Sequence, residues 1–336
     1  MSSHYPQIYQ KIAAELTVSL NQVIATVQLL DQGDSVPFIA RYRKEITGEL
    51  TDTQLRDLEE RLAYLRELED RRGVILASLA EQKVELPLLL EQINAAETKQ
   101  SLEDLYLPFK PKRRTKAQIA KEAGLLPLAM GLLEHPDQDP LQVALDYIDV
   151  EKGIADVKAA LEGARFILLD HFSEDAGLLG RLRDYLWHNA ILSAKVIEGQ
   201  EGAGVKFSDY YAYQEAIALI PSHRALALFR GRKEGFLRLQ LQLLDEAKAL
   251  MPEAWIAEQF GVCAKNRAAD AWLSETVRLT WRAKLQLSLE MDLLNQLREL
   301  ADADAIKVFA NNLRELLLAA PAGRKVTMAL DPGFRS

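Results

Sequence analysis

The sequence contains little that would support disulfide, metal or membrane chemistry. It has one cysteine, Cys263, in 336 residues, which excludes an internal disulfide. Its five histidines are scattered and lack the spacing of metal ligands. There is no run of roughly 18 apolar residues, as a membrane-spanning helix would need, and residues 1–10 lack the apolar core of a signal peptide. We therefore expect a cytoplasmic protein without a metal site or a membrane contact.

Signatures of common enzymes are missing as well. The sequence has no glycine-rich phosphate loop and no nucleophile elbow. Its net charge of −8 argues mildly against a dedicated nucleic-acid binder, but binding depends on local charge and not on the sum over the chain. We therefore expect no catalytic residues and no cofactor, and the local clusters of charge become the features to examine.

The composition favours helices. Leu occurs 57 times and Ala 44 times, and both residues are strong helix formers. Thr51 and Gln54 have the spacing of a capping box, which predicts the start of a long helix. The other faces of that helix alternate acid and base, which predicts a solvated surface with ion pairs four residues apart. One of its faces carries leucines at helical spacing, namely Leu55, Leu58, Leu62, Leu65 and Leu68.

Two segments have the pattern of strands. Residues 191–198 mix β-branched and polar side chains, and residues 236–243 alternate Leu with Arg or Gln at a period of two. We expect these two segments to pair in a small sheet. The predicted fold is therefore mainly α and multihelical, with a helix-turn-helix-like subdomain and a small β element.

The helix-turn-helix prediction depends on residues 119–134. Ala120 precedes Gly124 by four residues, so a small residue would permit a close helix crossing and the glycine would form the turn. Met130 and Leu133 fall on apolar positions of the second helix. This helix has almost no Arg, Asn or Gln with which to read base edges. We expect it to be structural or to contact a nucleic-acid backbone, and not to read an operator.

The strongest local cluster of charge lies just before this motif. Several Lys and Arg residues occur there before any acid intervenes at Glu122, in a segment where Pro108 and Pro111 predict an extended loop. Such a loop can neutralise several phosphates. It can equally be solvated or paired with the acidic face of the long helix, and both interpretations stay open. The candidate phosphate ligands are Lys110, Lys112, Arg113, Arg114, Lys116 and Lys121.

Two further clusters are basic. Ser222 is placed to cap a helix whose last turn carries Arg230, Arg232 and Lys233. These cations either complement the helix dipole or form a second patch that contacts phosphates. Arg41, Arg43 and Lys44 form a third cluster beside Glu45, where ion pairing is as plausible as ligand binding.

The end of the sequence has a different pattern. Residues 325–330 resemble a buried strand, and Asp331 follows at its tip. A single strand cannot form a sheet alone, so we expect the sequence to enter another domain of a longer protein. An acid at the end of a strand can hold Mg²⁺, as in nuclease folds, but it would need partner carboxylates beyond Ser336.

Several long motifs together resemble those of the Tex family of bacterial transcription accessory proteins. They occur in the order Val36–Glu45, Leu102–Leu125, Pro221–Gly235, Leu316–Gly323 and Leu330–Ser336. The resemblance implies a longer protein with a YqgF-type RNase H-like domain, helix-hairpin-helix elements and a C-terminal OB domain. It also implies nucleic-acid binding and a supporting role in transcription, without an established reaction. Asp331 would be the first acid of the RNase H-like domain.

We interpret the chain as a non-enzymatic region that binds RNA or DNA through phosphates and acts as a scaffold. RNA polymerase, ribosome-associated proteins and later domains of the same chain are the expected protein partners. The alternatives are part of a metal-dependent nuclease or resolvase, and a helical module that docks only proteins. The expected parts are an N-terminal helical region (1–111), the helix-turn-helix-like subdomain (112–190), a second helical part with the small β element (191–324) and the start of an RNase H-like domain (325–336).

Overall fold

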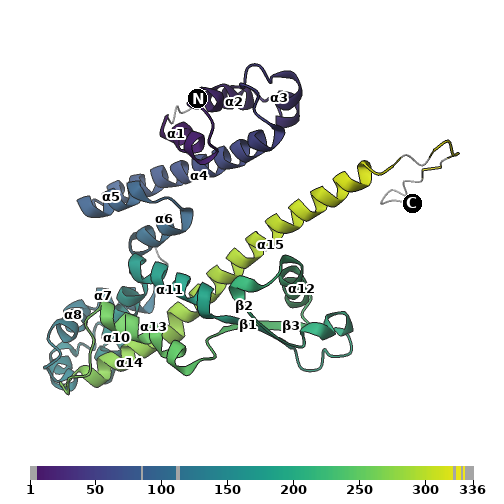
Figure 1. The fold of residues 1–336 in the computed structure, drawn as a ribbon. Helices are drawn as coiled ribbons and strands as arrows, with labels where there is room; N and C mark the ends of the chain where they lie inside the picture. The colour runs from purple at the N-terminus through teal and green to yellow at the C-terminus, as the bar shows by residue number, and fades with distance from the viewer. Residues whose placement is uncertain (1–5, 85, 111–113, 321–322, 327, 330–336) are drawn as a thin grey trace. The chain divides into compact units, whose positions relative to one another are not determined.

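The computed structural model describes residues 6–84, 86–110, 114–320, 323–326 and 328–329, which form helices α1 to α15 and one three-stranded sheet (Figure 1). This confirms the predicted mainly α, multihelical fold with a small β element. The chain divides into two compact units. Unit 1 comprises residues 1–113 with 174–176, and unit 2 comprises residues 114–173 with 177–336.

Unit 1 is built around one long helix, α4. Thr51 caps this helix and forms the predicted capping box with Gln54, and Ser19 and Gln22 form a second capping box at α2. The leucine stripe of α4 is buried as predicted, each side chain being at most 4% exposed. The helices of unit 1 are α1 (Pro6–Glu15), α2 (Leu20–Asp31), α3 (Val36–Tyr42), α4 (Asp52–Glu81), α5 (Pro87–Ala95) and α6 (Lys99–Tyr106).

The charged residues of α4 form ion pairs both within the helix and with neighbouring helices. Arg56 does pair with Asp52 four residues away. Other α4 arginines, however, bridge to neighbouring helices: Arg61 to Glu15 at 2.5 Å, Arg66 to Asp31 at 2.7 Å and Arg71 to Glu103 at 2.5 Å. The predicted pairing four residues apart is thus confirmed for Arg56 and Asp52, whereas the bridges between helices were missed because sequence spacing within one helix cannot reveal an acid on another. These ion pairs link α1, α2 and α6 to α4.

No single helix among the described residues is long and apolar enough to cross a membrane. The bent pair α1 and α2 meets the length and composition test when the two are taken together, with 117° between them. The apolar side chains of these two helices pack in the core of unit 1, where Ile12, Val23 and Val27 are buried.

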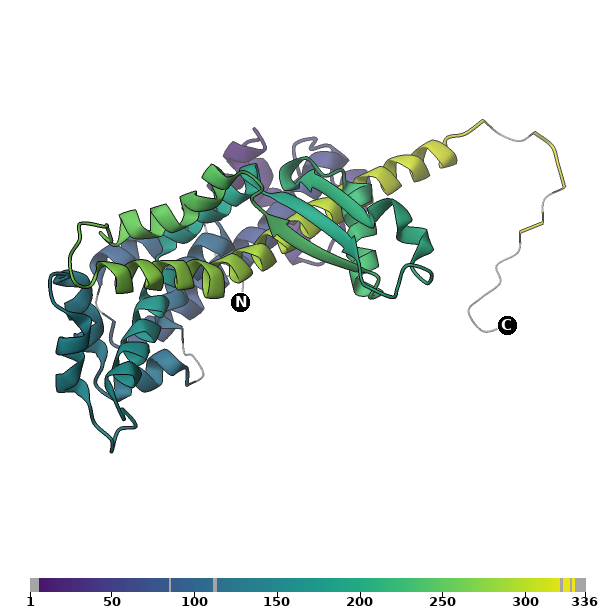
Figure 2. The ribbon, with the colours of Figure 1, turned by 90° about the horizontal axis from the view of Figure 1, so that it is seen from below.

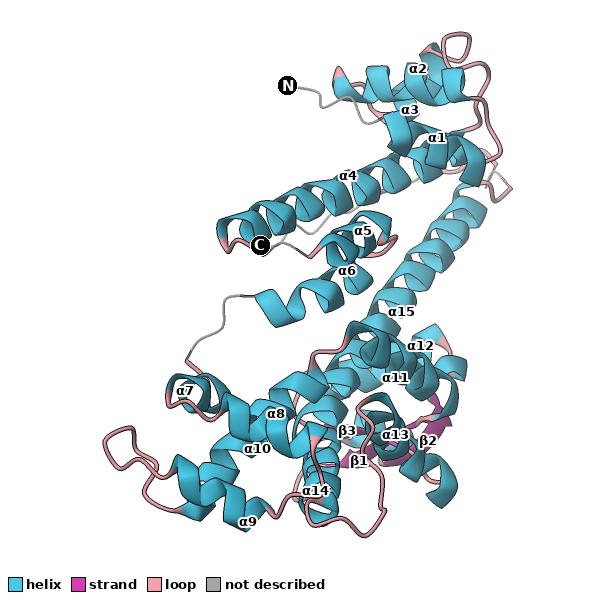
Figure 3. Ribbon diagram, turned by 90° about the vertical axis from the view of Figure 1, so that its left-hand side faces the viewer, coloured by secondary structure: helices cyan, strands magenta, loops and turns pink. Residues whose placement is uncertain are grey.

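Unit 2 combines helices with the sheet, and Figure 3 shows how small its strand content is. Its helices are α7 (Lys116–Glu122), α8 (Leu126–Glu134), α9 (Pro140–Val143), α10 (Val157–Ser173), α11 (Ala176–Asn189), α12 (Ser222–Lys233), α13 (Glu246–Gln259), α14 (Asp270–Thr280) and α15 (Gln286–Leu317). A π-helical turn, Trp281–Leu285, joins α14 to α15.

The sheet is antiparallel in the order β2-β1-β3 and lies beside α15 (Figures 1 and 2). The predicted pairing of its first and last strands is confirmed: β1 (Ile191–Val196) pairs with β3 (Leu237–Gln242). The sequence pattern missed β2 (Ala212–Ala216), an edge strand without apolar alternation. An edge strand with unpaired backbone groups can pair with another chain and so promote association. At the β3 edge one such group is already satisfied, because Leu241 donates its backbone N–H to Glu290 of α15 at 3.2 Å.

The region of the predicted helix-turn-helix consists of α7, α8 and the turn between them. Gly124 has the φ of +90° that this turn requires. The close crossing, however, is made with α10: a Cβ on Gly163 would lie 2.3 Å from Leu125 Cδ1 and 3.4 Å from Ala120 Cβ. The small residue Ala120 therefore packs against α10. The sequence of α7 and α8 alone could not predict this third helix as the partner. A DNA-binding role for this motif stays a prediction.

Three local predictions need correction. Pro108 and Phe109 lie in a 3₁₀ turn, Lys110 is extended, and Pro111 lies outside the described residues. Ser222 does not cap α12; its hydroxyl donates to Asp304 at 2.5 Å. The described residues between 325 and 329 are not in a strand, and Val326 and Met328 are exposed. Asp331 lies outside the described residues.

Candidate nucleic-acid interface

The main candidate site is a groove between α12 and α15. As predicted, the last turn of α12 carries Arg230, Arg232 and Lys233, and all three side chains are exposed. They border a cavity of about 920 Å³ on its α12 side, and Arg298 of α15 adds a fourth cation opposite. We call this the α12–α15 groove. Its lining is Leu226, Phe229, Arg230, Arg232, Lys233, Glu234, Leu294, Asn295, Arg298 and Asp302.

The groove has more positive than negative charge. Its four cations face two acids, Glu234 and Asp302. Glu234 pairs with Lys206 outside the groove at 2.5 Å, and Asp302 lies 3.7 Å from the guanidinium of Arg298, the cation on the α15 side. Within the described chain, no carboxylate lies within 4.0 Å of the three α12 cations. Burial raises the pKa of Glu290 and Arg232 acts from a distance to lower it, but with no described carboxylate in contact all three cations remain available to an anionic ligand.

Glycines explain the arrangement of the cations on α12. Gly231 faces the sheet so closely that a Cβ would lie 2.5 Å from Leu237 Cδ1 and 3.3 Å from Phe207 Cδ1. The cations on either side of it are exposed. The helix ends at Lys233, and Gly235, just past the C-cap residue Glu234, has a φ of +81°, with Phe236 N–H donating to Gly231 O at 2.9 Å. The packing of Gly231 therefore fixes the face on which the flanking cations are displayed.

The basic run at 110–121 is divided between the two units. In unit 1, Lys110 lies 3.8 Å from Glu103. Lys112 and Arg113 are outside the described residues. In unit 2, Arg114 pairs with Glu122 at 2.9 Å. Hydrogen bonds from Gln118 and then from Arg114 lower the pKa of Glu122.

The other cations of the run belong to α7. The Lys116 ammonium lies 4.8 Å from the centre of the Phe166 ring, and Lys121 is exposed in the last turn. Neither has a carboxylate within 4.0 Å among the residues that the structure describes. Lys110 approaches Glu103 of α6 within unit 1, and Arg114 pairs with Glu122 of α7 within unit 2, so pairing of the run with α4 stays a prediction. Phosphate contact by this run stays a prediction.

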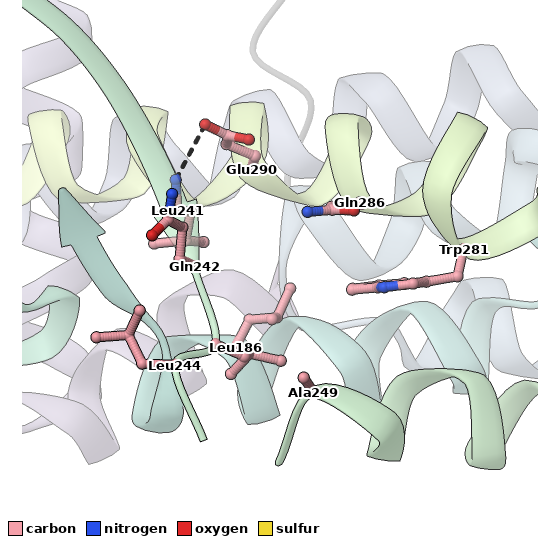
Figure 4. A pocket seen from close by; sticks show the side chains of 9 residues that line it. Leu186, Leu241, Gln242, Leu244, Ala249, Trp281, Gln286 and Glu290 are labelled. Atoms are coloured by element: carbon pink, nitrogen blue, oxygen red, sulfur yellow. Dashed lines mark hydrogen bonds between the residues drawn. The ribbon is translucent and has the colours of Figure 1, made fainter. Parts of the chain in front are cut away.

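A second cavity, of about 260 Å³, lies between β3, α11, α13 and α15 (Figure 4). Trp281 and Gln286 face Leu186 and Ala249 across it, and Glu290 lies at one end. Burial raises the pKa of Glu290, although its bond from Leu241 N–H acts in the opposite direction. A search of the described residues finds no group of three His, Cys, Asp or Glu side chains placed to hold a metal ion.

Sequence reasoning missed the α15 side of the groove. Arg298 is four residues before Asp302 in a long helical run, so it resembled an ordinary surface pair. Asn295 and Phe229 carried no signal at all. Their role follows only from the packing of α12 on α15, two helices that are far apart in the sequence.

Comparison with known proteins gives two family matches. Residues 6–80 match the Tex-like protein N-terminal domain, and residues 135–309 match the Tex central region-like model. Both matches lie within the part of the sequence that carries the motifs described above.

Individual relatives agree with these models. Protein YhgF of Escherichia coli K12 and transcriptional accessory protein Tex of Neisseria gonorrhoeae are each 53% identical over 329 residues, which is 97% of this chain. S1 RNA-binding domain-containing protein 1 of Homo sapiens is 26% identical over 322 residues, which is 92% of this chain and 32% of that protein. The chain spans 43% of the length of each of the two bacterial relatives.

Proposed function

The chain belongs to the Tex family, as its motifs predicted, and from this premise we propose that it is a nucleic-acid-binding and scaffolding region of a transcription accessory protein. The observation that carries the proposal is the α12–α15 groove, where three cations that lie within 4.0 Å of no described carboxylate face a fourth across a cavity of about 920 Å³. The names of the relatives support it: one is a transcriptional accessory protein and another an S1 RNA-binding domain-containing protein.

The proposed mechanism is electrostatic. Arg230, Arg232, Lys233 and Arg298 would each replace counterions on a phosphate, and the released ions would drive binding. Phosphate contacts position a protein on nucleic acid but carry no sequence information. The groove should therefore bind RNA or DNA without preference for a base sequence.

The basic run at 110–121 forms a second part of the proposal. Its exposed members Lys116 and Lys121 lie on α7, the first helix of the helix-turn-helix-like motif. Backbone contact would suit this motif, because the following helix α8 is made mostly of apolar residues and offers few groups for base edges.

We propose binding without catalysis. The described residues supply no cluster of acids for a two-metal site, and Asp331 lies outside them. Because the nuclease alternative needs carboxylates beyond Ser336, the test is incubation of the full-length protein, and not of this chain alone, with labelled RNA and DNA in Mg²⁺. Intact substrate is the expected result, whereas cleavage that is lost in the Asp331→Asn variant would favour the nuclease alternative.

The scaffolding part of the proposal concerns protein partners. RNA polymerase, ribosome-associated proteins and the additional length of the relatives are the candidates, in a cytoplasmic setting. A pull-down with nuclease treatment tests this part. Partners that stay bound after nuclease digestion are expected, and partners that are all lost would contradict a scaffolding role.

Binding itself is tested by fluorescence anisotropy with a labelled duplex DNA and a labelled single-stranded RNA. The variant Arg230→Gln/Arg232→Gln/Lys233→Gln should weaken binding to both. A matched control, Lys158→Gln/Lys248→Gln/Lys265→Gln, removes the same charge from exposed positions of unit 2 outside the groove. Equal affinities of the two triple variants would contradict the groove as the site.

A further inference from the structure

The motif that contains α3 displays aromatic and basic side chains together in unit 1. Tyr42 is 60% exposed and Phe38 is 36% exposed, although both rings are large and apolar. The two rings lie one helical turn apart, with their centroids separated by 5.2 Å and their planes at 47°. We call Phe38, Arg41, Tyr42, Arg43 and Lys44 the α3 patch.

The helix beneath the patch is firmly anchored. Val36 and Ile39 of α3 are 2% and 0% exposed, and they belong to the core of unit 1. Residues one helical turn apart share a face, so burying Val36 and Ile39 leaves Phe38 and Tyr42 on the exposed side. The exposed rings are therefore presented by a fixed backbone.

Among the described residues, no acid pairs with the basic residues of the patch. Arg41 and Lys44 are exposed, and the part of the chain that the structure describes places no carboxylate within 4.0 Å of either, or of Arg43. Arg43 instead lies with its guanidinium carbon 5.1 Å from the centre of the Phe38 ring and donates to Tyr42 O at 3.4 Å. The ion pairing considered for this cluster from the sequence is thus not seen among the described residues.

This combination identifies the chemistry of a partner. Protein interfaces are likewise enriched in aromatic residues and Arg, but they are depleted of Lys and concentrate apolar residues at their centre, whereas this patch carries Lys44 beside two arginines. Proteins that bind single-stranded nucleic acid instead combine aromatic rings, on which bases stack, with cations that hold the neighbouring phosphates. Every base has a stackable face, but in a duplex these faces are already covered by neighbouring base pairs.

We propose that the α3 patch is a second nucleic-acid contact, which stacks an unpaired base on Tyr42 and holds flanking phosphates with Arg41 and Lys44. The inference depends on the proposed function in taking nucleic acid as the partner, and it adds a preference for single strands at a site separate from the α12–α15 groove. Phe38 and Arg43 support the platform, since the guanidinium lies over the Phe38 ring and this ring lies against Tyr42.

The test compares Tyr42→Ala and Tyr42→Phe in the whole chain. Loss of the ring should weaken binding of a single-stranded RNA about fivefold or more, as expected for one stacked base. Tyr42→Phe keeps the ring and should retain nearly all of the affinity. Binding of a duplex DNA of the same length should be unchanged in both variants. Phe309→Ala, which removes an aromatic side chain of 68% exposure elsewhere, is the matched control.

The outcomes separate this inference from the function on which it depends. If Tyr42→Ala binds single-stranded RNA as the wild type does, while the triple groove variant binds both ligands more weakly, the α3 patch is not a contact and the groove proposal stands. If Tyr42→Ala weakens duplex binding as much as single-strand binding, stacking of an unpaired base is refuted. If the wild-type chain binds neither ligand at low salt, both proposals fail.

Discussion

Replacement of Gly231 by alanine tests whether α12 packs against Leu237 of β3 as closely as the structure shows. A Cβ at this position would lie 2.5 Å from Leu237 Cδ1 and 2.8 Å from Leu237 Cγ. Leu237 is 1% exposed and Phe207, the next neighbour, is 4% exposed, so neither side chain has free space into which to move. The new methyl group must therefore force α12 away from the sheet or strain the core.

The magnitude follows from two opposing effects. Alanine is favoured over glycine in a helix by about 0.8–1 kcal/mol. Overpacking of a close-packed core costs about 1–3 kcal/mol. We expect Gly231→Ala to lower the free energy of unfolding of unit 2 by about 1 kcal/mol. Gly180 in α11 is the matched control, because it is an exposed helical glycine with nothing within 4 Å of an added Cβ. Gly180→Ala should raise the free energy of unfolding by up to about 1 kcal/mol.

The assay is urea unfolding followed by tryptophan fluorescence. All four tryptophans, Trp187, Trp255, Trp272 and Trp281, belong to unit 2, so this signal reports on the unit that contains α12. The two variants should differ by about 1–3 kcal/mol, which is the overpacking cost alone. Equal stabilisation by both substitutions would refute the close approach of α12 to β3.

Three further predictions concern buried or bridged carboxyls. Burial raises the pKa of Glu290, so the folded chain binds the proton of this carboxyl more tightly than the unfolded chain does. The free energy of unfolding should therefore fall as pH rises from about 4.5 through the folded pKa, and Glu290→Gln should remove this decline in urea melts. The hydrogen bond from Arg66 lowers the pKa of Asp31, so its contribution is lost as pH falls below 3.8, and Asp31→Asn should flatten the acid limb seen by circular dichroism. Asp170→Ala should cost about 1–3 kcal/mol in urea melts, because it removes the carboxylate with which the Lys284 ammonium pairs; an unchanged midpoint would contradict this pairing.

The local pattern of the sequence predicted much of the fold because local physics decides it. The leucine stripe of α4 and its Thr51 cap depend only on helical spacing, and both are present in the structure. The alternation in β3 predicted its pairing with β1. By contrast, β2 was missed because an edge strand needs no alternating pattern, and only its hydrogen bonds to β1 define it.

The candidate site was only half visible in the sequence. The cations at the end of α12 form a compact run and were predicted from it. Their neighbour Arg298 lies on α15, and its place in the groove depends on how two distant helices pack. Gly231 shows the same limit, since its close approach to Leu237 is a property of tertiary packing. Contacts that depend on tertiary packing cannot be predicted from the local sequence pattern.

The salt dependence of binding tests the central claim most directly. The anisotropy titration with duplex DNA is repeated from about 0.05 to 0.5 M salt for the wild type and for Arg230→Gln/Arg232→Gln/Lys233→Gln. Each phosphate contact contributes about 0.9 to the slope of log K against log salt on duplex DNA, so loss of three contacts should make the slope shallower by about 2.7. A variant slope equal to that of the wild type would contradict the account, because the cations of the groove would then neutralise no phosphates.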